Sequence, residues 1–305
     1  MKKIISVKNL EKKYGKLTAV NGISFDVYKG EIFGLLGENG AGKTTTLEML
    51  EGLRKPSAGE ISVLDCNLEK DLGCIKEKIG VQLQSSAYYG FLTLTEILEL
   101  FGSFYQKRLD PIGLLEMVDL KEKANSYVGN LSGGQKQRFS IVASLVNDPE
   151  VVFLDEPTTG LDPLARRNLW NLISKIKSQG KTIILTTHYM EEAEVLCDRI
   201  AIMEKGKILA MDDTHLLMDK AEYPFTINFV KENVSDATIK KLEKLGRVEN
   251  LFGKNNHFIV KMKEQKASLA AIEIVESIKP ETVTSGRATL EDLFIELTGK
   301  SIEEN

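Results

Sequence analysis

Short apolar runs alternate with helical patterns over the first two thirds of the chain. Residues 31–36 (EIFGLL) form an apolar run of strand length, and residues 43–53 place Leu47, Leu50 and Leu53 at helical spacing. A buried strand followed directly by a helix is therefore predicted, with these three leucines directed inward. A second apolar run, 151–154, has the composition of a central strand that is covered on both faces.

The remaining elements complete an α/β pattern. Further strands are expected near residues 4–10 and 20–28, and alternating strands and helices resume from Val151 to Met211. Residues from about 90 to 145 interrupt this alternation with helical patterns. Alternation of strands and helices predicts an α/β nucleotide-binding core, here with an inserted helical subdomain.

Helix start signals support the inserted subdomain. Thr93 and Glu96 have the spacing of a capping box for a helix at 97–105. Asp110 followed by Pro111 predicts the start of another helix at 112–118.

The pattern changes after about residue 220. Strands are predicted at 225–230, 257–262 and 281–285, with helices at 235–245 and 267–278. This order predicts a small C-terminal α+β domain, for which a ferredoxin-like topology is one arrangement. We therefore predict two domains, a nucleotide-binding domain at 1–220 and an accessory domain at 221–305.

Composition narrows the possible function classes. The 305 residues are 42% hydrophobic, which is ample for a core, and the net charge of -4 leaves no electrostatic footprint for nucleic acid. No stretch approaches 18 consecutive apolar residues, so no membrane span is predicted. Three dispersed cysteines, Cys66, Cys74 and Cys197, make a disulfide framework or a structural metal site unexpected and fit a reducing cytosol.

Residues 37–44 (GENGAGKT) fit the phosphate-loop pattern G-x-x-x-x-G-K-[ST] between the predicted strand and helix. The glycines allow backbone N–H groups to turn toward phosphate oxygens, and the helix N-terminus adds its positive end. We expect Lys43 to reach the β and γ phosphates of a nucleotide and Thr44 to hold Mg²⁺. The predicted nucleotide-binding residues of this region are Gly37, Asn39, Gly40, Gly42, Lys43, Thr44 and Thr45.

Two acidic residues follow the second apolar run. Asp155 is predicted at the carboxyl end of the strand, where open α/β sheets bind ligands, and could position Mg²⁺ through water. Glu156 comes one residue later and is suited to polarise an attacking water as general base. Taken alone, such a pair is more often a helix cap or a solvated turn.

Residues 131–135 (LSGGQ) lie between these two motifs. Ser132 and Gln135 have capping-box spacing, so a helix is predicted to begin here and to run through Phe139, Val142 and Leu145 toward Pro149. Gly133 and Gly134 leave N–H groups unobstructed at a positive helix end, where a second anion could bind.

Together these motifs, in this order, resemble the ATP-binding cassette (ABC) ATPases over about residues 4–215. The resemblance implies that Tyr14 stacks on adenine and that Gln84 senses Mg²⁺ and the attacking water. It also implies that Asp162 lies in a loop that crosses to a partner subunit and that His188 contacts the γ-phosphate. Gln82 is close enough to leave the glutamine assignment open, although the run from Gly80 to Gln84 favours Gln84.

The resemblance also implies cofactors and partners. ATP and Mg²⁺ are expected, with Thr44, Gln84 and Asp155 around the metal and Glu156, His188 and Gln84 in catalysis. In the family, Ser132, Gly133, Gly134 and Gln135 bind the γ-phosphate of an ATP held by the other subunit. One phosphate loop and one LSGGQ segment per chain therefore predict a second cassette, most simply a copy of this chain.

Two further segments resemble the bacterial drug and antibiotic exporters of that family: residues 187–194 (THYMEEAE) and the tail 289–298 (TLEDLFIELT). The predicted function is that of an ATP-hydrolysing subunit that drives a separate transmembrane permease, bound peripherally at the cytoplasmic face of the cell membrane. Alternatively, the tail is an amphipathic helix that packs Leu293, Phe294 and Leu297 onto the cassette.

Two other function classes fit the sequence less well. A soluble ATPase of translation or DNA repair would usually carry two cassettes or long coiled-coil insertions, and a non-catalytic regulator would be expected to lack Glu156 or His188.

An aromatic segment, 85–91, follows Gln84. It is predicted to help form the groove where a membrane subunit inserts a coupling helix; the alternative is that its aromatic side chains only pack the core of the helical subdomain.

Overall fold

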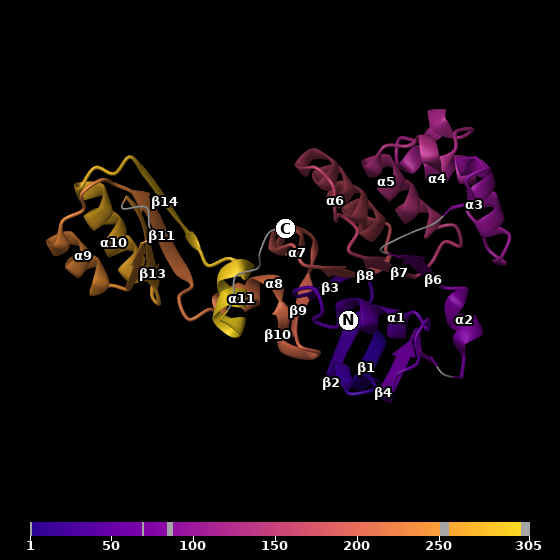
Figure 1. The fold of residues 1–305 in the computed structure, drawn as a ribbon, viewed down its shortest axis with the longest axis horizontal. Coiled ribbons are helices and arrows are strands. Elements are labelled where there is room, and N and C mark those ends of the chain that lie inside the picture. Colours follow the sequence, from indigo (N-terminus) through magenta and orange to yellow (C-terminus); the bar gives the residue numbers. More distant parts are fainter. Residues whose placement is uncertain (1, 69, 84–87, 251–255, 300–305) are drawn as a thin grey trace. The chain divides into compact units, whose positions relative to one another are not determined.

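The computed structural model describes residues 2–68, 70–83, 88–250 and 256–299 (Figure 1). The chain divides into two compact units, Met1–Asp212 and Asp213–Asn305. This break precedes the predicted boundary at residue 220, because the helix α8 (Thr214–Asp219) packs against the C-terminal helix α11 (Leu290–Thr298) in the second unit.

A six-stranded sheet forms the centre of the first unit, in the order β10-β9-β3-β8-β7-β6. Its strands are β3 (Ile32–Leu36), β6 (Ile79–Gln82), β7 (Val151–Asp155), β8 (Thr182–Thr187), β9 (Arg199–Glu204) and β10 (Lys207–Asp213). Strands β3, β6, β7, β8 and β9 pair in parallel. The register places Leu36 opposite Thr187 and Asp155 opposite Thr186. Three carboxyl strand ends therefore meet at one edge of the sheet, directly before the phosphate loop.

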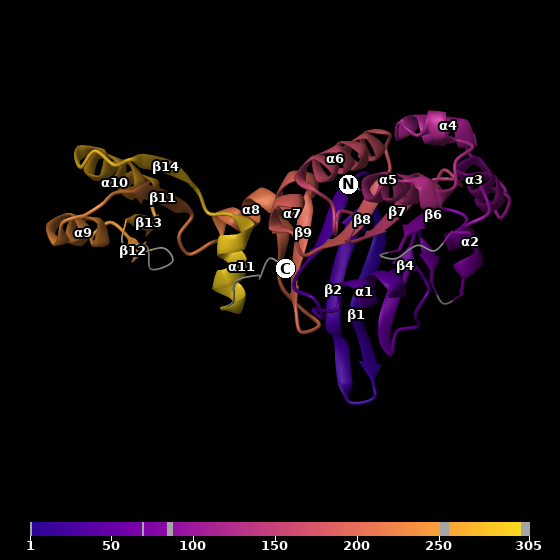
Figure 2. The same cartoon turned by 45° about the horizontal axis from the view of Figure 1, so that its top comes forward.

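A second, antiparallel sheet has the order β2-β1-β4-β5. Its strands are β1 (Lys3–Tyr14), β2 (Leu17–Tyr28), β4 (Ala58–Val63) and β5 (Cys66–Asn67). Figure 2 shows β1, β2 and β4 in a layer apart from β7 and β8. The first two strands are longer than predicted because a tight turn at Gly15, with φ +57°, continues the hairpin past both expected ends.

The helix α1 lies between the two sheets (Figure 1) and contacts β2, β7 and β8. The helices of this unit are α1 (Lys43–Leu50), α2 (Leu72–Lys76), α3 (Leu94–Gly102), α4 (Pro111–Met117), α5 (Gly133–Ala143), α6 (Pro163–Ser178) and α7 (Met190–Leu196). Leu47 and Leu50 join the core between the sheets, as predicted. The prediction for Leu53 was wrong: α1 ends at Leu50, and the side chain of Leu53 beyond it is 58% exposed.

The helices of the inserted subdomain begin after the predicted capping residues, but they end early: α3 ends at Gly102 rather than at residue 105, and α5 ends at Ala143, before Leu145. Thr93 and Glu96 form a complete capping box on α3, and Asp110 caps α4 with Pro111 in its first turn. Two short 3₁₀ turns, Lys121–Lys123 and Val128–Asn130, connect α4 to α5.

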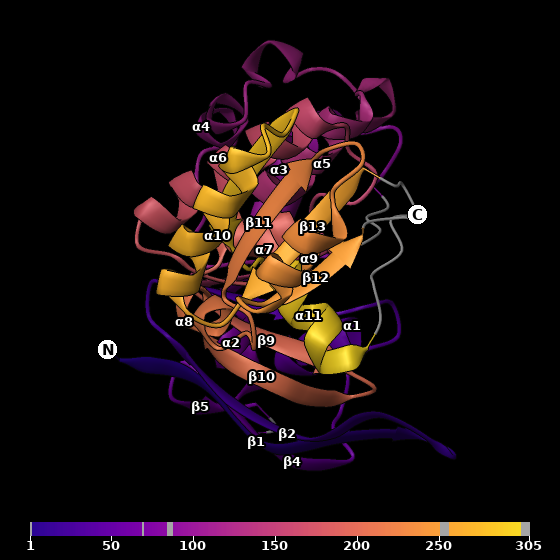
Figure 3. The same ribbon diagram turned by 90° about the vertical axis from the view of Figure 1, so that its left-hand side faces the viewer.

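The second unit has the element order β11 (Phe225–Val230), α9 (Asp236–Glu243), β12 (Arg247–Asn250), β13 (His257–Met262), α10 (Gln265–Ser277) and β14 (Thr282–Arg287). Its antiparallel sheet runs β12-β13-β11-β14, and α9 and α10 contact it and one another (Figure 3). This is the β-α-β-β-α-β order of a ferredoxin-like fold. Strand β12 was not predicted, because its four residues (RVEN) carry a single apolar side chain.

The tail forms an amphipathic helix, but its buried stripe differs from the prediction. Leu290, Leu293 and Phe294 are buried in α11, whereas Leu297 is 38% exposed. Helical spacing from Leu290 selects Leu293 and Phe294, and Leu297 falls outside the contact with α8. Among the described residues, no helix combines the length and the apolar character needed to cross a bilayer.

One buried carboxyl group lies at the end of α1. Glu51 is 2% exposed, and neither oxygen of its side chain has a hydrogen-bond partner among the described residues. Burial, together with the negative charges of Asp155 and Glu48, raises the pKa of Glu51 from its ordinary 4.5 to about 8.

This raised pKa predicts a pH-dependent stability. The folded protein binds more protons than the unfolded chain between pH 4.5 and about 8, so this contribution is complete below 4.5 and is lost as the pH rises through about 8. Since Glu51→Gln cannot titrate, its unfolding midpoint relative to wild type should rise between about pH 6 and about pH 9. Thermal unfolding at both pH values measures this; a difference between variant and wild type that does not change with pH would contradict it. Glu60→Gln, at an exposed position of β4, is the control.

Candidate functional site

The phosphate loop connects β3 to α1 through positions that require glycine. Gly42 has φ +102°, and a Cβ atom on it would lie 2.5 Å from the carbonyl oxygen of Ala19. A Cβ atom on Gly37 would lie 2.3 Å from the carbonyl oxygen of Met203. Neighbouring backbone thus fills the space where side chains would stand, and the loop can close around the start of α1 only with glycine at these positions.

Lys43 is held beneath this loop. Its Nζ atom donates to the carbonyl oxygens of Gly37 at 2.7 Å and Glu38 at 3.1 Å, and lies 3.3 Å from Glu156 Oε1. The side chains of Lys43 and Glu156 are only 4% and 5% exposed. A buried cation therefore faces both the loop and the acidic strand end.

Asp155 ends β7 beside two hydroxyl groups. Thr44 Oγ1, from α1, donates to Asp155 Oδ1 at 3.1 Å, and Thr186 Oγ1, from β8, donates to the same oxygen. The prediction that Asp155 stands at the carboxyl end of its strand is confirmed. A hydroxyl group and a carboxylate side by side are oxygen ligands of the kind that Mg²⁺ prefers, so Thr44 and Asp155 fit the predicted metal site.

Glu156 adopts a left-handed backbone conformation, with φ +46°. Its N–H donates to the side-chain and main-chain oxygens of Thr186, at 2.9 and 3.2 Å. Its carboxylate accepts from Thr159 Oγ1 at 3.2 Å. The strained backbone is thus fixed from two sides and directs the carboxylate toward Lys43 rather than along the strand.

His188 follows β8 and approaches the same carboxylate. Its Nδ1 atom lies 3.3 Å from Glu156 Oε2, within ion-pair distance but without hydrogen-bond alignment. The ring also contacts Tyr189, with centroids 4.1 Å apart, and the guanidinium of Arg166 stacks on Tyr189 at 4.2 Å.

The charges of this cluster shift one another's titration. The contact with His188, and then the positive charge of Lys43, lower the pKa of Glu156 to about 2 although burial opposes this shift. Burial raises the pKa of Asp155 against the hydrogen bonds from Thr186 and Thr44. Burial likewise lowers the pKa of Lys43, opposed by Glu156. Glu156 is therefore ionised at neutral pH and able to accept a proton.

The structure describes only some of the residues that the family resemblance alone assigned to the site. Tyr14 ends β1 with its ring 40% exposed, between Lys12 and Arg54, whose cationic groups lie 5.3 and 5.4 Å from its centroid. Gln84 lies outside the described residues. Gln82 is buried on β6, where its Nε2 donates to the carbonyl of Leu83, and no described residue bonds its Oε1. The choice between the two glutamines stays a prediction.

The LSGGQ segment lies on a different element from the lysine cluster. Ser132 and Gln135 form both hydrogen bonds of a capping box at the start of α5, as predicted. Ser132 and Gly133 are exposed, and a Cβ atom on Gly133 would meet nothing within 4 Å. A Cβ atom on Gly134 would lie 3.4 Å from Ala165, in the first turn of α6, the helix that Asp162 caps. The starts of α5 and α6 therefore adjoin and present Ser132 and Asp162 to solvent.

Sequence reasoning overlooked Thr186 and Thr159. Thr186 is fully buried and bonds both acidic residues, and Thr159 bonds the carboxylate of Glu156. The sequence did hold a signal for Thr186: a pair of threonines ends an apolar strand directly before His188. Ligands of open α/β sheets bind at the carboxyl ends of the strands, so polar residues there are candidates for the site.

Residues 20–159 match the ABC transporter family. The Nod factor export ATP-binding protein I of Burkholderia lata is 44% identical to this chain, over 70% of this chain and 72% of the relative's own length. The linearmycin resistance ATP-binding protein LnrL of Bacillus subtilis is 34% identical over 99% of this chain and all of its own length.

Solved structures extend this similarity to three dimensions. An ATP-binding subunit of an ABC transporter shares 31% identity over 70% of this chain and 91% of its own, with a TM-score of 0.63. A dimeric ATP-binding cassette bound to ADP and phosphate shares 27% identity over 69% of this chain and 98% of its own, also with a TM-score of 0.63.

Thr186 generates a prediction about the cluster. Thr186→Val removes one donor to Asp155 and one acceptor for the Glu156 N–H, so the rate of ATP hydrolysis should fall about 10- to 100-fold, the equivalent of one or two hydrogen bonds to a charged group. Thr186→Ser keeps the hydroxyl and should hydrolyse at close to the wild-type rate. Steady-state phosphate release measures both variants; equal rates for Val and Ser would remove Thr186 from the site.

Proposed function

Because the chain belongs to the ABC transporter family and is an ATP-hydrolysing transporter subunit, we propose that it drives export through a separate transmembrane partner at the cytoplasmic face of a membrane. The observation that carries the proposal is the buried contact of Lys43 with Glu156 beneath the phosphate loop, next to Asp155 and His188. Drugs, antibiotics or similar molecules are the proposed substrates, in line with the names of the Nod factor export and linearmycin resistance relatives.

In this proposal the phosphates of ATP lie against the loop glycines, with Lys43 between the loop and the γ-phosphate. Thr44 and Asp155 hold Mg²⁺, together with Gln84, and the ion neutralises phosphate charge when bound. Tyr14, whose ring is exposed, stacks on the adenine. Asn39, Gly40 and Thr45 complete the binding residues at the loop and the start of α1.

The shared use of Lys43 links binding to catalysis. Phosphate oxygens compete with Glu156 for the lysine, whose charge comes second to the His188 contact in lowering the pKa of Glu156. The pKa of Glu156 then moves toward its ordinary 4.5, and its carboxylate becomes a stronger base for the attacking water. His188 keeps that carboxylate oriented.

The second cassette is proposed to be a copy of this chain. The exposed start of α5 offers Ser132, Gly133 and the N–H groups beyond them to a phosphate held by the other copy, and Gln135 fixes the turn. Asp162 approaches the partner from the adjoining start of α6. ATP then bridges two chains, so closure of the dimer depends on nucleotide.

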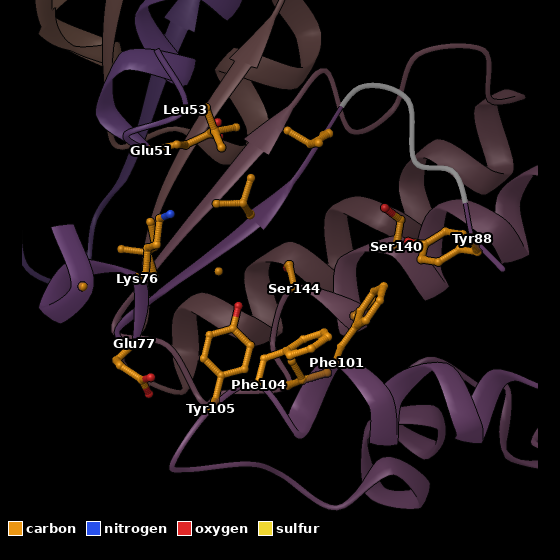
Figure 4. A pocket seen from close by; sticks show the side chains of 17 residues that line it. Glu51, Leu53, Lys76, Glu77, Tyr88, Phe101, Phe104, Tyr105, Ser140 and Ser144 are labelled. Carbon is orange, nitrogen blue, oxygen red and sulfur yellow. The ribbon is translucent and has the colours of Figure 1, made fainter. Parts of the chain in front are cut away.

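The permease is proposed to bind in a groove of about 730 Å³ within the first unit. Figure 4 shows its aromatic wall, with Phe101, Phe104, Tyr105 and Tyr88, across from Glu51, Leu53 and Lys76. Residues 85–87 of the aromatic segment lie outside the described residues, whereas Tyr88 lines this groove and also packs on Phe139, with ring centroids 5.2 Å apart. We call this cavity the docking groove.

Glu156→Gln tests the catalytic assignment. The variant keeps the size of the side chain but cannot accept the proton, so ATP hydrolysis should slow by about 10²- to 10⁴-fold while ATP still binds. Single-turnover hydrolysis and nucleotide-binding assays separate the two effects. Hydrolysis at the wild-type rate would show that another group is the base.

Gly133→Asp tests the second cassette. The added carboxylate places a negative charge where the partner's phosphate is proposed to bind, so ATP-dependent dimerisation of the Glu156→Gln protein should be lost. Size-exclusion chromatography with light scattering measures it. Gly286→Asp, which adds the same charge on an exposed strand of the second unit, should leave the dimer intact; a dimer that survives Gly133→Asp contradicts the arrangement.

The transporter role is tested by affinity purification of tagged Glu156→Gln protein from detergent-solubilised native membranes with ATP and Mg²⁺. A multi-spanning protein recovered in stoichiometric amount is the expected result. Recovery of a dimer alone, or of ribosomal or DNA-associated proteins, would contradict the proposal.

A further inference from the structure

Glu51 forms part of the wall of the docking groove without any counter-charge. Its side chain is 2% exposed, and no described residue donates a hydrogen bond or lies at ion-pair distance to its carboxyl oxygens. A buried carboxyl group without partners costs stability, by an amount comparable to the desolvation of the group. The other buried carboxylates of this unit differ: Glu31 bonds Arg199, and Glu192 accepts from Trp170.

The remaining charges of the docking groove do not compensate Glu51. Lys76 is exposed on α2, and its amino group forms no ion pair with Glu51. Glu77 adds a second carboxylate, which accepts from the backbone N–H of Gln106 at 3.3 Å. Glu77 and Lys76 carry opposite charges, so the docking groove holds no spare cation for Glu51 among its otherwise apolar and aromatic side chains.

We propose that Glu51 receives a lysine or arginine side chain from the docking segment of the transmembrane partner. This inference rests on the proposed transporter function. The occupant would place an apolar surface against Phe101, Phe104 and Leu53, and would direct its cation to the inner end of the docking groove.

The chemistry of membrane proteins favours such an occupant. Cytoplasmic loops of membrane proteins carry an excess of lysine and arginine, so a segment that enters from the membrane side has cations available. The exposed aromatic and apolar lining, with Leu53 and Phe104 both largely solvent-accessible, is typical of a surface that another chain covers. A desolvated ion pair at the centre of such an interface sets the register of the two chains.

Glu51 also lies at the far end of α1 from the nucleotide. This helix begins at Lys43 and Thr44, and Glu51 follows its last residue, Leu50. A cation bound at Glu51 therefore acts on the same helix whose first turn holds the phosphate loop. The pair would fasten the partner to the helix whose first turn carries Lys43 and Thr44.

The test compares partner recovery for full-length variants, each in the tagged Glu156→Gln background. Glu51→Gln and Glu51→Met should reduce retention of the co-purifying multi-spanning protein about 30-fold, the loss expected when one member of a buried charge pair is removed. Neither should lower the thermal unfolding midpoint of the isolated chain, because each removes a carboxyl group without partners. Glu77→Gln, the matched carboxylate of the docking groove with a bond of its own, should stay within about threefold of wild type.

Charge reversal makes the test specific. Glu51→Lys should abolish recovery, and replacement of one lysine or arginine of the partner's cytoplasmic segments by glutamate should restore it. Unchanged retention in the Glu51 variants, equal losses for Glu51→Gln and Glu77→Gln, or no restoring substitution would each overturn the inference while leaving the transporter role standing. Failure to recover any multi-spanning protein with Glu51 intact would instead overturn the proposed function, and this inference with it.

Discussion

The buried ion pair of Lys43 and Glu156 is the interaction on which the rest of the site depends. Both side chains are almost completely excluded from water, and such a pair is stable only when its remaining donors and acceptors are satisfied. The loop carbonyls of Gly37 and Glu38 hold the lysine, while Thr159 holds the glutamate. In the proposed function, phosphate oxygens compete with these contacts for the lysine.

Strand register brings this chemistry together. Asp155 lies opposite Thr186 on β8, and Leu36, the last residue before the phosphate loop, lies opposite Thr187. A slip of one residue would turn Thr186 away from Asp155, since successive side chains of a strand point to opposite faces. The apolar runs in β3, β7 and β8 therefore serve function as well as stability, because they fix the register that places the polar ends.

Helix starts, which depend on residues close in the sequence, were predictable. Contacts between residues far apart in the sequence were not. The starts of α3, α4 and α5 follow from capping residues that act within three or four positions, and each forms as the sequence predicted. Thr186, by contrast, gains its role from a partner 31 positions away, which no local pattern encodes. Leu53 was assigned to the core because helical spacing continued through it, but the helix ended first and left the side chain on the docking groove. Strand β12 was not predicted because it lies at the edge of its sheet, where a strand needs few apolar side chains.

Leu53 and Glu51 show how one short helix can serve two surfaces. The first turn of α1 carries Lys43 and Thr44, which are proposed to bind phosphate and metal, while the apolar side chains Leu47 and Leu50 fill the space between the two sheets. Because the helix is only eight residues long, the residues that follow it reach the docking groove directly. A helix of this length spans only about 12 Å, so its two ends lie close together. The same packing that stabilises the core therefore ties the position of the phosphate loop to whatever occupies the docking groove.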